Sequence, residues 1–490
     1  MGWVMNTQSS LKWVAGALTS AVLVTGLSAC SPDNQPVTPW NRAYGGVDKS
    51  YDTGLLKQRD EMASRFQTLS FVDEVTGRTM TYNLYVPEHY DPNQNYPLVL
   101  FMADASTVGK GTEAPLKQGY GGFIWATPEE QAKHPAFVLV PAFAGPERVT
   151  NDDWQVSDEL GMALRLLGNV AAEYSIDPHR LYTTGQSMGG MISFYLNAHY
   201  PDLFAASLYV GSQWDVNVLK PLQQQRFVYV VSAGDPKASK GMADLGNLLT
   251  TDGVAFGSTH FSARLSLAEQ NQQVDHLLAQ RHAINFVQFD ANTVVPEGMD
   301  GGRGGEHMYS FDYAYQLTPV RDWLFQQSRA ADEHRLIDSV MEDEGLRYFE
   351  GKGVEQNYTT AAAYFRIATA LGHMKAPRYL GIAYEEGLGV SADLNRALDY
   401  YQQAVAKGDI TAAARIGWLY ERGLGVEQSY EKAYQWYIKA AINPEESARH
   451  VHPRVLAAQR LAFLYEQGLG VTQDLGQAAQ WAQIAASDTE

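Results

Sequence analysis

Continuous apolar runs and segments of helical periodicity alternate along residues 66–328 of the chain. Residues 96–102 and 137–141 are apolar at almost every position, which is typical of the inner strands of a parallel sheet, because both faces of such strands are buried. Residues 159–174 instead place apolar side chains at helical spacing. Further strand-like runs occupy residues 79–86, 181–184, 206–210, 227–232 and 284–289. Strands that alternate with helices in this way predict a doubly wound α/β sheet.

From about residue 339 the pattern changes to a repeat. The motif Gly-x-Gly-Val, with a tyrosine three residues before it, recurs at Gly351, Gly387, Gly423 and Gly468. Successive copies start 36, 36 and 45 residues apart. A period of this length is typical of a solenoid of helix pairs, in which glycine ends the first helix of each pair. We therefore expect an all-α helical solenoid over residues 339–490, with a longer helix connection around residues 442–455.

Composition and charge fit two folded domains and narrow the class of partner. A chain of 490 residues exceeds the roughly 250–300 residues that one hydrophobic core ordinarily serves. Hydrophobic residues make up 45% and charged residues 19%, which is typical of globular rather than disordered proteins. The formal net charge of -18 opposes binding to phosphate backbones, so we expect no nucleic-acid partner.

The first 30 residues have the layout of a secretory signal. Residues 1–29 contain no acidic residue, a single basic residue at Lys12, and an apolar run over residues 14–27 that is too short for a comfortable membrane span. The run ends in Leu-Ser-Ala before Cys30, which is the single cysteine of the chain. This segment resembles a bacterial lipobox; the alternative is a plain signal peptide followed by an incidental cysteine.

The lipobox resemblance implies that residues 1–29 are removed and that Cys30 carries acyl chains such as palmitate. Several acyl chains would hold the protein on a membrane without a spanning helix, because each buried methylene contributes roughly 0.8 kcal/mol. Ser31 after the cysteine resembles sorting to the outer membrane of the bacterial envelope. Residues 30–65 combine Pro, Asn, Gly and mixed charge without clean periodicity, so we expect a tether there.

The first candidate for chemistry is the motif Gly-Gln-Ser-Met-Gly around Ser187. A strand-like run leads into the motif and a helical run over residues 191–199 follows it. A strand, a sharp glycine-flanked turn and a helix predict a nucleophile elbow, which raises the Ser187 hydroxyl above the sheet. The backbone N–H of Met188 would then point at a developing oxyanion. The alternative is a glycine-rich packing turn without chemistry.

A serine nucleophile needs a base, and the base needs a carboxylate that holds its tautomer. In a fold with this elbow the chain order is serine, acid, histidine. His307 follows the last strand-like run and lies in a glycine-rich loop, so we expect it to be the base. The other histidines of this region after the elbow helix are expected to lie on the surface: His260, His276 and His282.

Two aspartates and one loop complete the expected site. Asp235 follows the strand-like run at residues 227–232 and is the expected acid, with Asp215, after the preceding run, as the alternative. The second oxyanion donor should come from the loop after residues 96–102, where the backbone N–H of either Asp104 or Ala105 could serve.

Residues 66–328 resemble the esterase and predicted-peptidase group that includes polyhydroxybutyrate depolymerase-like and feruloyl-esterase-like enzymes. The segments that carry the resemblance are residues 175–180 running into 185–190, and His307 with residues 320–325. It implies hydrolysis of an ester or amide through an acyl-enzyme intermediate. The chain departs from that group at Ala103-Asp104, where His-Gly is usual, so the resemblance does not choose between Asp104 and Ala105 as the donor.

The repeats of residues 339–490 resemble Sel-one-like repeats, relatives of tetratricopeptide repeats, which implies a protein partner on the solenoid. The leading hypothesis is therefore a serine hydrolase that cleaves a small-molecule or oligomeric ester, and the alternatives are a serine peptidase and an interaction scaffold with a relic site. No cofactor is expected, because no phosphate loop follows a strand. No metal is expected either, because His450 and His452 lie in the repeat insertion without further ligands nearby. Three tryptophans are candidates for the substrate rim or for core packing: Trp125, Trp154 and Trp214.

Overall fold

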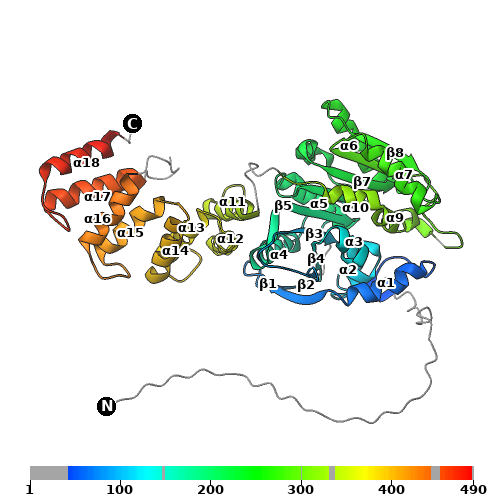
Figure 1. Cartoon of the computed structure of the whole chain (residues 1–490), viewed down its shortest axis with the longest axis horizontal. Coiled ribbons are helices and arrows are strands. Elements are labelled where there is room, and N and C mark those ends of the chain that lie inside the picture. The colour runs from blue at the N-terminus through cyan, green and yellow to red at the C-terminus, as the bar shows by residue number, and fades with distance from the viewer. Residues whose placement is uncertain (1–41, 146–148, 300, 330–336, 443–452, 488–490) are drawn as a thin grey trace, which may run out of the picture. The chain divides into compact units, whose positions relative to one another are not determined.

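The computed structural model describes residues 42–145, 149–299, 301–329, 337–442 and 453–487 (Figure 1). A mostly parallel α/β sheet with flanking helices comes first in the chain, and a run of paired helices follows it. This confirms the expected fold class. Cys30, His450 and His452 lie outside the described residues, so the predictions made for them concern parts of the chain that the structure does not describe.

The sheet has nine strands among the described residues, in the order β1-β2-β4-β3-β5-β6-β7-β9-β8. The β1–β2 and β2–β4 pairs are antiparallel and the remaining pairs are parallel. The strands are β1 (Gln67–Val72), β2 (Thr79–Tyr85), β3 (Tyr96–Met102), β4 (Phe137–Ala142), β5 (Ile176–Gln186), β6 (Ala206–Val210), β7 (Phe227–Ser232), β8 (Gly257–Phe261) and β9 (Ile284–Phe289). The apolar pattern did not predict β1 and β8, because both are edge strands with several exposed positions.

β5 starts before the apolar run that predicts it. Its pairing with β3 jumps from Tyr96–Ile176 to Leu98–Leu181, so four residues of β5, including Pro178, lie in an irregularity of the ladder. Proline is tolerated at such a position because it need not donate a ladder hydrogen bond.

Helices cover both faces of the sheet, which explains why the inner strands are continuously apolar. In β3, Leu98 and Leu100 pack into one hydrophobic cluster with α4, whereas Val99 and Phe101 pack into a second cluster on the other face. The helices of this domain are α1 (Thr53–Ala63), α2 (Ala114–Lys117), α3 (Pro128–Lys133), α4 (Asp158–Glu173), α5 (Met188–His199), α6 (Pro236–Thr251), α7 (Leu267–Leu278), α8 (Gly305–Met308), α9 (Ser310–Gln316) and α10 (Thr318–Phe325). Short 3-10 helices connect several of them: η1 (Arg42–Tyr44), η2 (Ala105–Thr107), η3 (Tyr120–Gly122), η4 (Ile124–Ala126), η5 (Val216–Val218), η6 (Lys220–Gln224) and η7 (Gly302–Gly304).

The expected tether over residues 30–65 is wrong in its second half. Helix α1 buries Leu55 and Met62 in the hydrophobic cluster that lies against the sheet. Lys49 is buried as well, with its Nζ 2.7 Å from the Oδ2 of the buried Asp312. The apolar residues of α1 are few and separated by charged ones, so only their contacts with the rest of the domain identify the segment as part of the core.

The C-terminal part is built from paired helices, as the repeat predicts. The helices are α11 (Ile337–Glu350), α12 (Tyr358–Ala370), α13 (Ala376–Glu386), α14 (Leu394–Ala406), α15 (Thr411–Arg422), α16 (Tyr430–Ala441), α17 (Pro453–Gln467) and α18 (Leu475–Ser487). Gly387 and Gly423 end α13 and α15 in the left-handed conformation, with φ of 72° and 67°. Glycine adopts this conformation at little cost, which accounts for its recurrence at this point of the repeat.

The first helix pair packs on α4 of the α/β domain. Met341 of α11 and Ile367 of α12 share a hydrophobic cluster with residues of α4. Arg165 of α4 donates to both carboxylate oxygens of Asp73, at 2.6 and 2.8 Å, and to the hydroxyl of Tyr364 in α12 at 2.8 Å. Among the described residues, none of the helices combines the length and the apolar character that crossing a bilayer requires.

Candidate active site

Ser187 lies in a strained turn between β5 and α5. Its backbone angles are φ 52° and ψ -118°, a positive φ that residues other than glycine seldom adopt. A β-carbon on Gly189 would overlap the backbone carbonyl of Met102 at the end of β3, so the tight approach of the two segments requires glycine there. Ser212, after β6, donates its hydroxyl to the carbonyl oxygen of Ser187 at 2.8 Å. The elbow predicted from the sequence is therefore present, and a side chain from the neighbouring strand end supports it.

The structure brings Ser187, His307 and Asp235 together at the carboxyl ends of the strands. The Nε2 of His307 lies 2.8 Å from the Oγ of Ser187, and its Nδ1 lies 2.5 Å from the Oδ2 of Asp235. Asp235 is 4% exposed, and its Oδ1 accepts from the backbone N–H groups of Lys237 and Ala238 at the start of α6. The helix start therefore holds the carboxylate in the orientation in which its other oxygen faces the imidazole. A proton on Nδ1 would leave Nε2 free to accept the Ser187 hydroxyl proton.

The alternative acid is not part of this arrangement. Asp215 accepts hydrogen bonds at Oδ1 from the backbone and side chain of Asn217. Among the other histidines, His260 pairs with Asp290 at the surface, with its Nδ1 3.0 Å from the Oδ1 of Asp290. Of the two aspartates that the sequence leaves open, only Asp235 contacts His307.

A buried hydrogen-bond network links the side chain of Asp104 to the elbow turn. The sequence did not predict this network. The side chain of Asp104 is 2% exposed and accepts from the backbone N–H of Ser106 at 2.7 Å. The side-chain amides of Gln118 and Gln186 also donate to its Oδ2, that of Gln186 at 3.1 Å. Gln186 directly precedes Ser187, so the carboxylate links the loop after β3 to the turn that carries Ser187. Asp104, one of the two residues that depart from the His-Gly pattern, therefore helps to position the turn that carries Ser187.

Three backbone N–H groups are available for an oxyanion. Those of Met188, Asp104 and Ala105 make no hydrogen bond to another residue in the described parts of the chain. Met188 is the first residue of α5, where the helix leaves its N–H groups unpaired. The expected oxyanion donors therefore remain a prediction, and the choice between Asp104 and Ala105 for the second one stays open.

The three candidate tryptophans have different environments. Trp125 is completely buried and donates from its indole N–H to the carbonyl of Gly121, so it belongs to the core. Trp154 is 39% exposed, has a φ of 61°, and meets Trp214 edge to face with the ring centroids 5.4 Å apart. Thr150 of the same loop donates to the carbonyl of Met188 at 3.5 Å. Trp154 therefore lies in a loop that contacts Met188 at the start of α5, the residue after Ser187.

Tyr229 is a further residue of the site that the sequence did not indicate. It lies in β7, and its hydroxyl donates to the carbonyls of Ser212 and Ala238. Burial raises the pKa of Tyr229 well above its ordinary value, and the nearby Asp235 carboxylate adds to the shift. The neutral phenol therefore connects the residue that supports Ser187 to the helix that holds Asp235.

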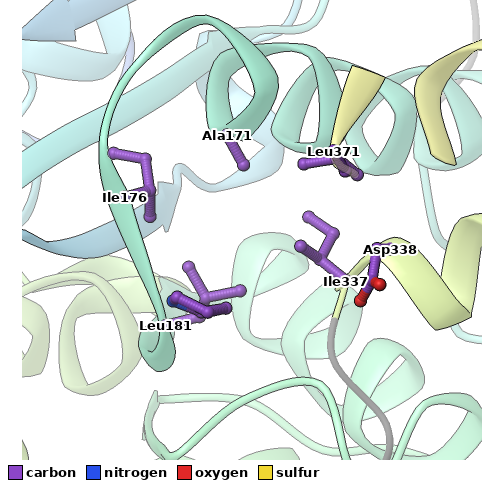
Figure 2. A pocket seen from close by; sticks show the side chains of 7 residues that line it. Ala171, Ile176, Leu181, Ile337, Asp338 and Leu371 are labelled. Carbon is purple, nitrogen blue, oxygen red and sulfur yellow. The ribbon is translucent and has the colours of Figure 1, made fainter. Parts of the chain in front are cut away.

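A separate cavity of about 160 Å³ lies away from these residues. Figure 2 shows its lining between β5, α4 and the first helix pair, from Ala171, Ile176, Pro178, Leu181, Ile337, Asp338 and Leu371. The lining is mostly apolar with a single carboxylate, Asp338, and it includes no residue of the Ser187 site.

The candidate site thus lies on a mostly parallel α/β sheet, with Ser187 on the sharp turn after β5. Residues 74–215 match the model of the Esterase family, described as "Putative esterase". The Sel1 repeat model matches four segments, residues 345–373, 378–409, 410–443 and 455–488. The two family models thus agree with the resemblances seen in the sequence, to esterases in the first part of the chain and to Sel-one-like repeats in the second.

Individual relatives are more distant. A poly(3-hydroxybutyrate) depolymerase from Ralstonia pickettii is 28% identical over 145 residues, which are 27% of this chain. The chain thus matches 29% of the length of that curated relative. The solved structure of a thermostable esterase is 22% identical, with a TM-score of 0.44, and covers 55% of this chain and 64% of its own. A Sel1 repeat protein from Oxalobacter formigenes is 29% identical, with a TM-score of 0.28, and covers 31% of this chain and 59% of its own.

Proposed function

We propose that this protein hydrolyses a carboxylic ester through an acyl-enzyme intermediate on Ser187. Its Oγ attacks the ester carbonyl while His307 takes the hydroxyl proton at Nε2, and Asp235 stabilises the imidazolium that forms. The backbone N–H of Met188, with that of Asp104 or Ala105, stabilises the oxyanion of the tetrahedral intermediate. The intermediate collapses and releases the alcohol, which receives the proton from His307. Water then attacks the acyl group with His307 as base and regenerates Ser187.

The observation that carries this proposal is the continuous hydrogen-bond chain from Ser187 through His307 to Asp235. The match of residues 74–215 to an esterase family supports the choice of bond. A fluorophosphonate probe should label Ser187 in folded protein, and Ser187→Ala should remove both the labelling and at least about 10⁴-fold of the kcat for a p-nitrophenyl ester. Labelling that persists in folded Ser187→Ala protein would contradict the assignment of the nucleophile.

The bond that is cleaved needs its own test, since the same machinery can hydrolyse amides. We propose the ester because of the esterase-family match, and we compare it with peptide cleavage. A panel of aryl, acyl and sugar esters should be turned over, and amides of the same acyl groups should not. Faster release from the amides would support a serine peptidase instead.

We also propose that Cys30 attaches the protein to the bacterial envelope. The proposal rests on the apolar run of residues 14–27 and on the position of the single cysteine. A labelled palmitate analogue should be incorporated into the full chain and should not be incorporated into Cys30→Ser, and only the former should sediment with membranes. Equal sedimentation of both chains would contradict the anchor.

The Sel1 repeats support a protein partner for residues 339–490. If partner binding alone carries the cellular role, Ser187→Ala should leave a phenotype intact that deletion of the repeats abolishes. We expect Ser187→Ala to abolish the phenotype as well, because this chain retains the sharp turn at Ser187 and the contact between His307 and Ser187.

A further inference from the structure

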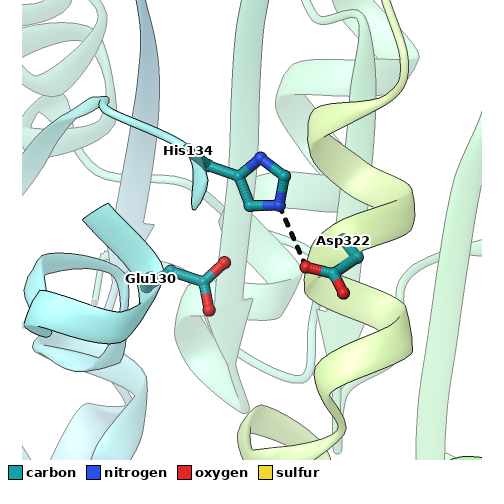
Figure 3. A group of neighbouring side chains, drawn as sticks. All are labelled: Glu130, His134 and Asp322. Carbon is teal, nitrogen blue, oxygen red and sulfur yellow. Dashed lines mark hydrogen bonds and ion pairs between the residues drawn. The ribbon is translucent and has the colours of Figure 1, made fainter. Parts of the chain in front are cut away.

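We propose a second site: Glu130, His134 and Asp322 bind one divalent transition-metal ion. Glu130 lies on α3, His134 directly follows that helix, and Asp322 lies on α10, almost 190 residues further along the chain. Figure 3 shows the three side chains converging on one another. One possible ligand atom of each residue lies within 4.8 Å of those of the other two. The fold thus assembles a set of ligands that no local motif indicates.

The strongest reason for a ligand is an unpaired oxygen of Glu130. The side chain is 3% exposed, and its Oε1 is buried without a hydrogen-bond partner among the described residues. Its Oε2 accepts from the Nε of Arg321 at 2.8 Å. An unpaired buried acceptor is costly, and such an atom in a folded protein usually faces an ion or an ordered water.

The other two ligands are already close to a geometry that a metal can use. The Nε2 of His134 lies 2.9 Å from the Oδ1 of Asp322, a separation that two ligands of one ion can have. Bonds of about 2.1 Å place tetrahedral ligand atoms roughly 3.4 Å apart. The ion would therefore replace the hydrogen bond between His134 and Asp322 and separate them slightly, and Glu130, whose ligand atom lies within 4.8 Å of theirs, would approach by a side-chain rotation.

The chemistry of the three ligands favours zinc and its neighbours over hard cations. An imidazole nitrogen with two carboxylates suits Zn²⁺, Co²⁺ or Mn²⁺, whereas Ca²⁺ and Mg²⁺ prefer sites made of oxygen alone. Two cations also face the cluster: Arg321, on the Oε2 of Glu130, and Lys133, whose Nζ lies 3.5 Å from the Oδ2 of Asp322. Arg321 bonds the oxygen that the metal does not need, and the half-exposed Lys133 can turn to solvent when the ion binds.

A metal here would join α3 to α10 and would not act on the Ser187 chemistry directly. The ring of His134 stacks on Phe325 of α10, with centroids 4.6 Å apart, so the two segments are already packed together. The ion would add a cross-link between these segments, and stabilisation follows because the unfolded chain lacks the assembled ligands.

The test uses full-length protein stripped of metal with a chelator, titrated with Zn²⁺ by calorimetry. Wild type should bind one ion that His134→Gln and Asp322→Asn bind at least about 30-fold more weakly. Zn²⁺ should also raise the Tm of wild type by about 3–6 °C and leave both variants unchanged. Far-UV circular dichroism checks that the variants are folded, and Asp322→Asn carries the test alone if His134→Gln does not fold.

His260→Gln is the matched control, because His260 also pairs with an aspartate, at 3.0 Å, but no third possible ligand lies near that pair in the described parts of the chain. It should bind Zn²⁺ like wild type, and any ion held by His307 or Cys30 is common to all of these chains. Equal Zn²⁺ binding by wild type and both site variants would overturn the proposal. A wild-type protein that binds no Zn²⁺ at 100 µM would also overturn the proposal, because Glu130 Oε1 would then face only water.

Discussion

The buried carboxylate of Asp104 offers a sharp test of how this active site is held together. Asp104 accepts from Ser106, Gln118 and Gln186, and Gln186 is the residue before the nucleophile. Asp104→Ala removes the acceptor and retains the backbone N–H that is a candidate oxyanion donor. The variant therefore separates the positioning of the loop from the presence of the donor.

The expected size of the effect follows from the contacts that are lost. Three donors lose a charged acceptor, and Gln118 and Gln186 keep a second contact, to the Ser106 hydroxyl and to the Oε1 of Gln118 respectively. Hydrogen bonds to a charged group contribute about 1.5–3 kcal/mol each, and partial rearrangement leaves a loss of about 3–5 kcal/mol in the free energy of unfolding. Loss of one aligned oxyanion donor lowers kcat by about 10²–10³-fold.

Steady-state hydrolysis of a p-nitrophenyl ester measures kcat, and urea unfolding followed by circular dichroism measures stability. Asp215→Ala is the matched control, because Asp215 also accepts from the N–H two residues ahead at the start of a short 3-10 helix. The side chain of Asp215 does not contact the residues of the elbow turn. We therefore expect the kcat of Asp215→Ala to stay within about twofold of wild type.

Three results would refute this reasoning. If Asp104→Ala loses stability but keeps kcat within about threefold, the loop does not supply the second donor. If neither stability nor kcat changes, the buried network does not hold the loop in place. A lower kcat in Asp215→Ala of similar size would show that any change at these loops disturbs the site.

Three further predictions concern other parts of the chain. Asp235→Asn should lower kcat by about 10³–10⁴-fold with unchanged circular dichroism, and a fall below tenfold would argue against its role beside His307. Trp154→Ala should raise KM for bulky aromatic esters and leave KM for acetate esters unchanged; equal effects on both would contradict a rim contact. Burial raises the pKa of Glu342 to about 7, with Asp343 adding to the shift. Ionising Glu342 therefore lowers the free energy of unfolding by on the order of 3 kcal/mol as pH rises from about 4.5 to 7. In urea unfolding, Glu342→Gln should be more stable than wild type at pH 8 and similar to wild type near pH 4.5. A difference that does not change with pH would contradict this.

Features that depend on the conformation of neighbouring residues could be predicted from the order of amino acids alone. Continuous apolar runs predicted the inner strands, because both of their faces are buried in this sheet. The glycines around Ser187 predicted the sharp turn, and the glycines of the repeat predicted helix ends that the structure places in the left-handed conformation. Chain order was enough to select His307 among the histidines, since it follows the last strand-like run.

Contacts between residues far apart in the chain could be identified only in the folded protein. Asp235 and Asp215 both follow a strand, and the position of the imidazole distinguishes them. The contact of Asp104 with Gln186 joins residues 82 positions apart, and that of His134 with Asp322 joins residues 188 apart. Periodicity and glycine placement report the conformation of neighbouring residues, whereas contacts of this kind depend on strand order and on how helices pack across the sheet. The packing of α1 against the core was missed for the same reason.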